Sequence, residues 1–170
     1  ISIQNTSNDF NARFSATKRS YVYKFLCRTA PPSILTNQVW HIQKRVDINA
    51  MKLAANHLVG NHDFSSFRST SCQAPSPIKT IDKFKFDFIN DVLEMKVEAK
   101  SFLHNQVRII AGSLIKVGTG LWNPDKIKQI LDLRSRSKAG ETAPPDGLYL
   151  EKVTYPKKFL NSKWPAYIND

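Results

Sequence analysis

Residues 102–118 read FLHNQVRIIAGSLIKVG, and the rest of the chain is arranged around this stretch. Apolar residues recur in it at steps of three and four, which is the spacing of one apolar stripe along a helix. The members of the stripe are Leu103, Val107, Ile110, Leu114 and Val117. The spacing predicts a helix over 102–118 that packs its stripe against a core.

The ends and the interior of this helix carry further signals. Ser101 is expected to cap its N-terminus, and Gly118 and Gly120 are expected to end it. Gly112 lies inside the helix, where a glycine costs about 1 kcal/mol relative to alanine. We therefore expect Gly112 to permit close packing against a neighbouring segment.

Arg108 is the unusual residue of the stretch. It follows Val107 at the edge of the stripe, away from the C-terminal turn where a cation gains from the helix dipole. An arginine at the rim of a buried face usually has a carboxylate or phosphate partner. The alternative is an arginine that extends along the surface into water. The spacing alone leaves both interpretations open.

The composition bounds the function. With 170 residues, the chain is expected to form a single domain over 1–170, with a polar lead-in at 1–11 and a tail at 156–170. Its 25 Lys and Arg residues against 14 Asp and Glu residues give a formal net charge of +11. Such an excess favours polyanionic partners, because each neutralised phosphate releases counterions. A basic protein without such a partner remains an alternative.

The cysteines and the first residues of the chain indicate the cellular compartment in which the protein works. Cys27 and Cys72 are the only cysteines, too few for a disulfide framework, and are expected to be the reduced thiols of a cytoplasmic protein. The sequence has no run of 18 apolar residues, so we expect no membrane contact. It begins with neither a signal-peptide pattern nor a methionine, and we expect it to be a piece of a longer protein.

Upstream of the helix, residues 14–28 alternate between two faces and predict a β-strand. One face carries Val22 and Leu26, and the other carries Tyr21, Tyr23 and Phe25. Cations accompany the strand, namely Arg13, Lys18, Arg19, Lys24 and Arg28. Aromatic rings among cations are typical of a surface on which bases stack and phosphates pair. A sheet with its aromatic residues in the core and its cations outside fits the pattern equally well.

The remaining elements complete an α+β pattern. We predict a short strand at 39–43 and a helix at 47–59 that is capped by Asp47, followed by a loop at 60–77 that is either functional or pinned by its Phe side chains. A hairpin is predicted at 78–88 and 92–99. After the central helix, we predict a helix that opens at Asn123-Pro124, a basic loop at 134–147 and a strand at 148–155; the apolar face of that helix carries Ile127, Ile130, Leu131 and Leu133. This order predicts a mainly antiparallel sheet with helices packed on one face.

Familiar catalytic and cofactor motifs are missing from the sequence. It contains no GxxxxGK[ST], no GxGxxG and no GxSxG. The histidines and cysteines match no zinc spacing, so we expect no metal. From the residues alone, we expect a basic α+β domain with an RNA- or DNA-facing surface and no visible nucleophile.

Five stretches resemble the tRNA pseudouridine synthase A family, in the order in which the family carries them. They are residues 12–25 (ARFSATKRSYVYKF), 58–68 (LVGNHDFSSFR), 72–81 (CQAPSPIKTI), 102–120 (FLHNQVRIIAGSLIKVGTG) and 139–156 (AGETAPPDGLYLEKVTYP). Because they are spread from residue 12 to residue 156, the resemblance implies the fold of that family's C-terminal domain.

The resemblance also implies roles for particular residues. Tyr21 corresponds to the tyrosine that contacts the target uracil, and Leu148 to a leucine that lines the uracil pocket. Arg108 corresponds to the arginine that pairs with the catalytic aspartate. The other candidate RNA contacts, by resemblance or by charge, are Arg13, Arg19, Arg68, Arg134 and Arg136.

The implied function is isomerisation of uridine to pseudouridine in the anticodon stem-loop of tRNA, by a homodimer without a cofactor. The nucleophilic aspartate of the family lies in a GRTDxGVH motif, which this sequence lacks. We therefore expect the chain to be the C-terminal half of such an enzyme and to be inactive alone. The alternative is a non-catalytic RNA-binding module of the same fold.

Overall fold

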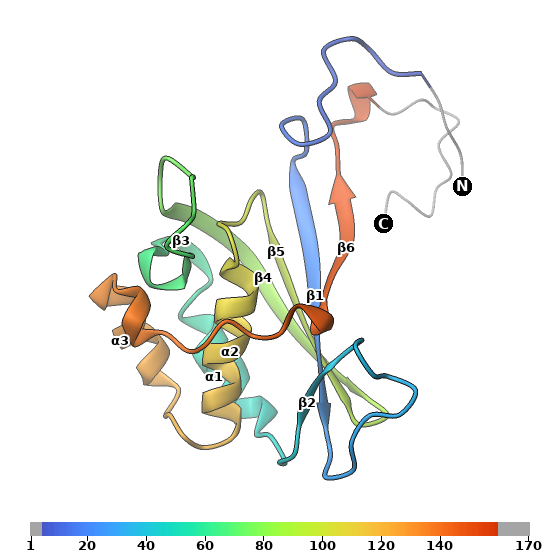
Figure 1. Cartoon of the computed structure of the whole chain (residues 1–170). Helices are drawn as coiled ribbons and strands as arrows, with labels where there is room; N and C mark the ends of the chain where they lie inside the picture. The colour runs from blue at the N-terminus through green and yellow to red at the C-terminus, as the bar shows by residue number, and fades with distance from the viewer. Residues whose placement is uncertain (1–4, 160–170) are drawn as a thin grey trace.

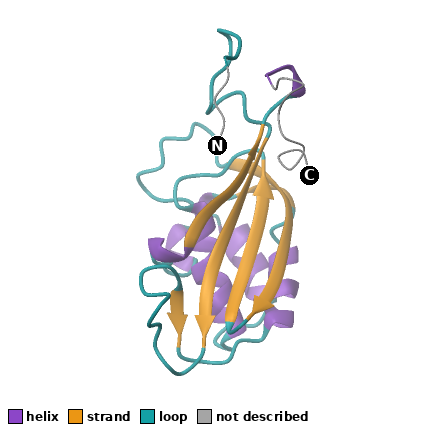
Figure 2. Ribbon diagram, turned by 90° about the vertical axis from the view of Figure 1, so that its right-hand side faces the viewer, coloured by secondary structure: helices purple, strands orange, loops and turns teal. Residues whose placement is uncertain are grey.

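The computed structural model describes residues 5–159 as a twisted sheet with helices on one of its faces (Figures 1 and 2). This arrangement confirms the predicted α+β class. The strands are β1 (Lys18–Cys27), β2 (Trp40–Ile42), β3 (Gly60–Asp63), β4 (Ile78–Ile89), β5 (Val92–Ala99) and β6 (Leu148–Thr154). The α-helices are α1 (Ile48–Asn56), α2 (Gln106–Gly118) and α3 (Asp125–Leu133).

Strand β1 pairs with three other strands, β2, β5 and β6. The sheet runs in the order β2-β1-β5-β4-β3, and β6 pairs with the first half of β1 on the side where β2 pairs with its end. Only the β1–β2 pair is parallel within the described sheet, so the prediction of a mainly antiparallel sheet is confirmed. Tyr21 lies between Val97 of β5 and Leu150 of β6.

The hairpin of β4 and β5 turns where the sequence predicted. Asn90 and Asp91 have φ angles of 48° and 66°, and they join Ile89 to its partner Val92. Two left-handed residues in a two-residue loop match the right-handed twist of the flanking strands. Asparagine and aspartate tolerate this conformation better than most residues, which explains the sequence signal.

The core lies between the sheet and the helices. All five residues of the predicted stripe, Leu103, Val107, Ile110, Leu114 and Val117, are buried. Tyr23 and Phe25 are fully buried under the helices, so these two rings belong to the core, as the alternative interpretation of β1 held. Phe64 and Phe67 are also fully buried, and they pin the segment after β3.

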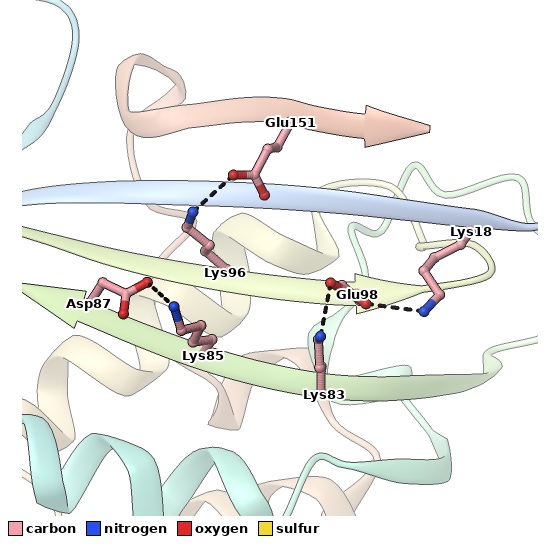
Figure 3. Close-up of polar contacts among 7 residues, drawn as sticks. All are labelled: Lys18, Lys83, Lys85, Asp87, Lys96, Glu98 and Glu151. Carbon is pink, nitrogen blue, oxygen red and sulfur yellow. Dashed lines mark hydrogen bonds and ion pairs between the residues drawn. The ribbon is translucent and has the colours of Figure 1, made fainter. Parts of the chain in front are cut away.

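The other face of the sheet is covered by charged side chains instead of helices (Figure 3). Lys18 and Lys83 both reach Glu98, at 3.2 and 3.3 Å. Lys96 reaches Glu151 at 2.9 Å, and similar pairs continue along the hairpin. Alternation along β5 therefore separates a core face from a solvated face, whereas β1 also buries Val22 and Leu26 on the second face.

The predicted start of the central helix is wrong. Helix α2 begins at Gln106, and Asn105 before it is left-handed with φ 60°. The Gln106 side-chain oxygen accepts a hydrogen bond from the Leu103 amide at 2.8 Å and closes the turn before the helix, whereas neither Ser101 nor the N-cap residue Asn105 caps the helix through its side chain. Because the chain does not become helical until residue 106, residues 100–105 are free to line a surface.

Two further predictions need correction. The segment 60–77 is not wholly a loop, because β3 pairs with β4 through its backbone although its sequence, GNHD, carries no apolar signal. Leu133 is 54% exposed and lies off the apolar face of α3, because a helix of 3.6 residues per turn points position 133 away from the stripe of Ile127, Ile130 and Leu131. Helix α1 keeps its predicted cap, with Asp47 accepting from the Ala50 amide at 2.9 Å.

The two ends of the described chain meet. The Phe10 ring packs edge-on against Tyr155, with ring centroids 5.1 Å apart, and Lys158 reaches Asp9 at 3.2 Å. Residues 1–4 of the predicted lead-in and 160–170 of the predicted tail lie outside the described residues. No helix among residues 5–159 is long and apolar enough to cross a bilayer.

Candidate functional site

A cleft of about 1030 Å³ opens beside the N-terminal end of α2. Residues 100–108 form one wall, the start of β1 with the segment before it forms another, and residues 71–75 and Leu148 close it. Five cations line the cleft, and the described residues that line it include no aspartate or glutamate. These cations are Arg13, Arg19, Lys79, Lys100 and Arg108.

The cleft brings together the three residues for which roles were predicted. Tyr21 reaches it from β1, Arg108 from the first turn of α2, and Leu148 from the first position of β6. They are separated by up to 127 positions in the sequence. The roles themselves remain predictions, whereas their convergence on one cleft is a property of the fold.

Arg108 is held in a defined direction. Its Nε donates to the carbonyl oxygen of Ala143 at 2.6 Å, and its Nη1 donates to the Asn105 side chain at 3.2 Å. The residue is half-buried. Within residues 5–159, no carboxylate lies within ion-pair distance of this guanidinium. The guanidinium is therefore held by the fold on one side, and its predicted acidic partner remains a prediction.

The segment that holds Arg108 lies directly on α2. Residues 139–147 cross the face of this helix on their way to β6 (Figure 1). A Cβ on Gly112 would collide with the backbone oxygen of Glu141, which confirms the predicted close packing at this glycine. The Ser113 hydroxyl accepts from the Gly140 amide at 2.9 Å and adds a polar contact to the packing.

Leu148 is fixed by the end of the same segment. The buried Tyr23 hydroxyl donates to the carbonyl oxygen of Pro144 at 2.7 Å, and burial raises the pKa of this phenol. A Cβ on Gly147 would lie 2.7 Å from the Lys24 carbonyl oxygen, so only glycine fits there. Leu148 then pairs with Tyr23 as the first residue of β6.

Tyr21 presents a half-buried ring to the cleft. Its ring packs edge-on against Phe102, with centroids 5.3 Å apart and planes at 87°. Phe102 comes from the non-helical segment that precedes α2. The late start of the helix thus supplies the aromatic neighbour of Tyr21.

Two predicted RNA contacts, Arg13 and Arg19, also line the cleft. Arg19 donates to the backbone carbonyls of Lys100 and Arg13, so its guanidinium joins two walls. The Arg13 side chain is exposed. The part of the cleft lined by Arg13 and Arg19 is therefore cationic, and the hydrogen bonds from Arg19 to two backbone carbonyls hold it in place.

The other three predicted RNA contacts do not line the cleft. Arg68 lies next to it and donates to the Cys72 carbonyl oxygen at 3.4 Å. Arg134 is 3.5 Å from the Asp63 carboxylate. Arg136 donates to Gly140 and Thr142 within the segment that covers α2, and burial lowers its pKa. Part of the donor capacity of these arginines serves the fold.

Several cleft residues were not predicted. Lys79 and Lys100 are lone lysines in the sequence, and nothing in their spacing marked them. Cys72 lies in the wall, where its sulfur accepts from the His104 amide at 3.5 Å. Gln106 is buried, and its side-chain nitrogen has no hydrogen-bond partner among the described residues. The FLHNQVR pattern contained Gln106, but nothing in the pattern showed that its side chain closes the turn before the helix.

The sequence of the chain matches a known protein family. The chain belongs to the tRNA pseudouridine synthase family, because the family model described as tRNA pseudouridine synthase matches residues 54–156. The chain is 46% identical over 155 residues to the proteins named tRNA pseudouridine synthase A of Brucella ovis, Brucella canis and Brucella suis. The match confirms the family resemblance.

The match also has a defined extent. It covers 91% of this chain and 62% of each of these relatives. The chain therefore spans less than two thirds of the length of the proteins that it resembles. These relatives therefore have sequence outside the region that matches this chain.

Proposed function

We propose that the chain is the C-terminal part of a tRNA pseudouridine synthase that isomerises uridine to pseudouridine in the anticodon stem-loop of tRNA. One observation carries the proposal: Tyr21, Arg108 and Leu148 line one cationic cleft in a chain of this family. The working enzyme is a cytoplasmic homodimer that needs no cofactor, and residues 1–170 form one domain of it.

The reaction rearranges one base on its ribose. The C1′–N1 bond breaks, the uracil turns, and C5 bonds to C1′; C5 then loses its proton and N1 gains one, so the product is an isomer of the substrate. An aspartate nucleophile holds the sugar or the base meanwhile. In our proposal that aspartate comes from the half of the enzyme that this sequence lacks.

Arg108 is the partner of the nucleophilic aspartate in this proposal. A fixed cation keeps a desolvated carboxylate ionised and sets its direction. The support is the geometry of the guanidinium, whose Nε and Nη1 are already bonded to Ala143 and Asn105. These two bonds leave other N–H groups of the guanidinium to donate to a carboxylate, and the planar guanidinium matches the geometry of the two carboxylate oxygens.

Tyr21 and Leu148 form the walls of the uracil site. A nucleotide turned out of its stack needs an aromatic or apolar surface against which its base can rest. Tyr21 is supported from the side by Phe102, and Leu148 is placed by the segment bonded to Tyr23. Neither residue is the nucleophile in this proposal, because that role belongs to the aspartate of the other half of the enzyme.

Phosphate contacts supply most of the affinity. Arg13 and Arg19 are the contacts inside the cleft, and Arg68, Arg134 and Arg136 extend the cationic surface beyond it. The tRNA backbone is the polyanion that the net charge of +11 favours.

The test replaces Arg108 in the full-length protein that carries this sequence. Arg108→Ala leaves a buried carboxylate unpaired, which costs about 3–5 kcal/mol, and should lower the single-turnover rate by several orders of magnitude. Arg108→Lys keeps the charge but loses the planar guanidinium, so its single-turnover rate should fall between those of the unaltered protein and Arg108→Ala. Binding of tRNA should persist in both variants, because other phosphate contacts carry it.

A matched control is Arg28→Ala. Arg28 also donates to a backbone carbonyl, that of Ala30 at 3.1 Å, but it does not line the cleft. Its replacement should leave the single-turnover rate unchanged. A parental rate for Arg108→Ala would refute the ion pair. The 170-residue chain alone should make no pseudouridine, and a parent sequence without a GRTD-like motif would favour the non-catalytic RNA-binding module.

A further inference from the structure

Phe14 is the exposed aromatic residue of the cleft. Its side chain is 77% exposed although the residue lines the cleft. The Arg13 guanidinium lies over its ring, 5.4 Å from the centroid. Neither the family match nor the predicted roles assign a function to this ring.

The backbone around Phe14 is held by its own side chains. The Asn11 side-chain oxygen accepts from the amides of Arg13 and Phe14, at 2.9 and 3.0 Å. The Asn11 carbonyl accepts from the Ser15 amide at 2.8 Å, and the Ser15 hydroxyl accepts from the Asn11 amide at 3.0 Å. This turn fixes the position from which the Phe14 side chain projects.

Two contacts tie the turn to the sheet. Arg19 of β1 donates to the carbonyl oxygen of Arg13. The Tyr155 hydroxyl, just beyond β6, donates to the carbonyl oxygen of Ala12 at 2.9 Å. The segment therefore has an ordered backbone and an exposed aromatic side chain. Phe14 therefore does not fill the core, in contrast to Phe64 and Phe67, which are fully buried.

The surroundings of Phe14 indicate what covers the ring. Five cations and no described carboxylate line the cleft, so an anionic partner is favoured. An aromatic face among cations fits single-stranded RNA, because a base stacks on the ring while its phosphate pairs with an arginine. A protein partner without phosphates would leave the cations unpaired, and the cleft supplies no acid for them.

The position of Phe14 selects the nucleotide. Arg19 lies two residues before Tyr21 on the same face of β1, which is about 7 Å along a strand. Because the Arg19 side chain holds the Arg13 carbonyl, the Phe14 turn is placed next to the proposed uracil site and beyond it. This placement favours the nucleotide adjacent to the target as the one that meets the ring.

We propose that Phe14 is a stacking platform for the base of the nucleotide next to the target uridine, and that Arg13 binds a phosphate of the same nucleotide. The platform holds the strand in place while the target base is turned out of its stack. This inference rests on the proposed function, since it requires an RNA substrate in the cleft.

The experiment uses the full-length protein that carries this sequence and two anticodon stem-loop RNAs. Each RNA carries the fluorescent base 2-aminopurine on one side of the target uridine, because stacking on an aromatic ring quenches its fluorescence. Unaltered protein should quench the probe on one of the two sides. Phe14→Leu keeps an apolar side chain but removes the π face, so it should abolish that quenching and weaken RNA binding on the order of tenfold or more.

Two further variants complete the design. Phe14→Tyr keeps the ring and should retain both the quenching and the affinity. Phe88→Leu replaces another exposed aromatic residue, which is 50% exposed and lies at the end of β4 outside the cleft, and should leave both signals unchanged. Because Phe14 is mostly exposed, its replacement should also leave the unfolding transition unchanged.

The outcomes separate the inference from the proposed function. If unaltered protein binds and modifies the stem-loop but Phe14→Leu keeps wild-type quenching and affinity, the platform is refuted and the proposed function stands. If no probe is quenched although RNA binds, the platform is likewise refuted. If unaltered protein neither binds nor modifies the RNA, the proposed function fails and the platform fails with it.

Discussion

Arg108 and Ala143 are joined by two hydrogen bonds that run in opposite directions. The Arg108 Nε donates to the Ala143 carbonyl oxygen at 2.6 Å, and the Ala143 amide donates to the Arg108 carbonyl oxygen at 3.2 Å. The direction of the guanidinium therefore depends on the segment 139–147 that covers α2. Residues that position this segment should affect the cleft without touching it.

Gly112→Ala tests the packing of this segment. The added methyl group collides with the backbone oxygen of Glu141, which cannot move without shifting the segment. Alanine improves helix propensity by about 1 kcal/mol, but overpacking against backbone costs about 1–3 kcal/mol or more. We expect a net loss in the free energy of unfolding, measured by urea denaturation.

Gly118→Ala is the matched control on the same helix. There the added methyl group meets the Met51 side chain, with the sulfur at 2.6 Å. A methionine side chain is flexible and can change rotamer, so this variant should lose less stability. Equal losses in the two variants would show that the contact with Glu141 does not limit the packing.

Lys100→Ala tests the cationic cleft. Lys100 is exposed and lines the cleft. If its ammonium pairs with one RNA phosphate, its removal should reduce the slope of log affinity against log salt by about 0.7 to 0.9. Filter binding of a tRNA across a salt series measures this slope in the full-length protein. Lys44→Ala removes an exposed lysine outside the cleft and should leave the slope unchanged, and a Lys100→Ala slope equal to that of the unaltered protein would contradict the assignment.

The sequence predicted the elements that carry strong periodic or turn signals. The stripe from Leu103 to Val117, the Asn90-Asp91 turn and the Asp47 cap are each local patterns, and each is present in the structure. Strand β3 has no such pattern, since it is four polar or small residues that pair with β4 through the backbone and through the Asn61 side chain, which donates to Thr80 at 2.9 Å. Hydrophobic patterning cannot detect an edge strand of that kind.

The cleft was predictable only in part. Family resemblance pointed to Tyr21, Arg108 and Leu148, and charge interleaved with aromatic residues pointed to Arg13 and Arg19. The wall from 100 to 105 was not foreseen, because the apolar spacing continues through Leu103 while the left-handed Asn105 interrupts the helix. That interruption depends on the backbone conformation of Asn105 and on the hydrogen bond from the Leu103 amide to the Gln106 side chain, neither of which periodicity reports.

Glu98 should make stability depend on pH. Burial alone would raise the pKa of this carboxyl, but hydrogen bonds from Lys18 and Lys83 more than offset it, so the pKa is lowered (Figure 3). A carboxyl whose pKa is lower in the folded state adds stability above its unfolded pKa, about 4.3, and loses it as the pH falls through the folded value. The unfolding free energy of the unaltered protein should therefore fall more between pH 6 and 3 than that of Glu98→Gln.

The size of this effect is bounded by the exposure of its partners. Lys18 and Lys83 are 44% and 63% exposed, so the difference between the two proteins should stay within about 1 kcal/mol at neutral pH. Glu141→Gln, at an exposed carboxylate, should keep the pH dependence of the unaltered protein. Urea denaturation at each pH gives the comparison, and parallel pH profiles for all three proteins would contradict the assignment.

Cys72 and Cys27 should differ in reactivity although both are 9% exposed. Burial, with the nearby Asp91 charge, raises the pKa of the Cys27 thiol to about 11. Burial also opposes ionisation of Cys72, but amides of Ala74 and His104 and the Arg68 charge outweigh it, so the Cys72 pKa is lowered. Because the thiolate is the reactive form, iodoacetamide near neutral pH should alkylate Cys72 at least an order of magnitude faster.

Equal exposure makes the two thiols controls for each other. Their rates, followed by peptide mass spectrometry, should converge in urea, where the folded environments are lost and both pKa values return toward about 8.5. In the folded full-length protein, a bound anticodon stem-loop should slow the alkylation of Cys72, which lies in the cleft wall, and leave that of Cys27 unchanged. Faster alkylation of Cys27 in the folded protein would contradict the assigned electrostatics. Protection of both thiols by RNA would mean that the stem-loop acts on the whole fold and not at the cleft, because Cys27 lies at the far end of β1 beside Ile42.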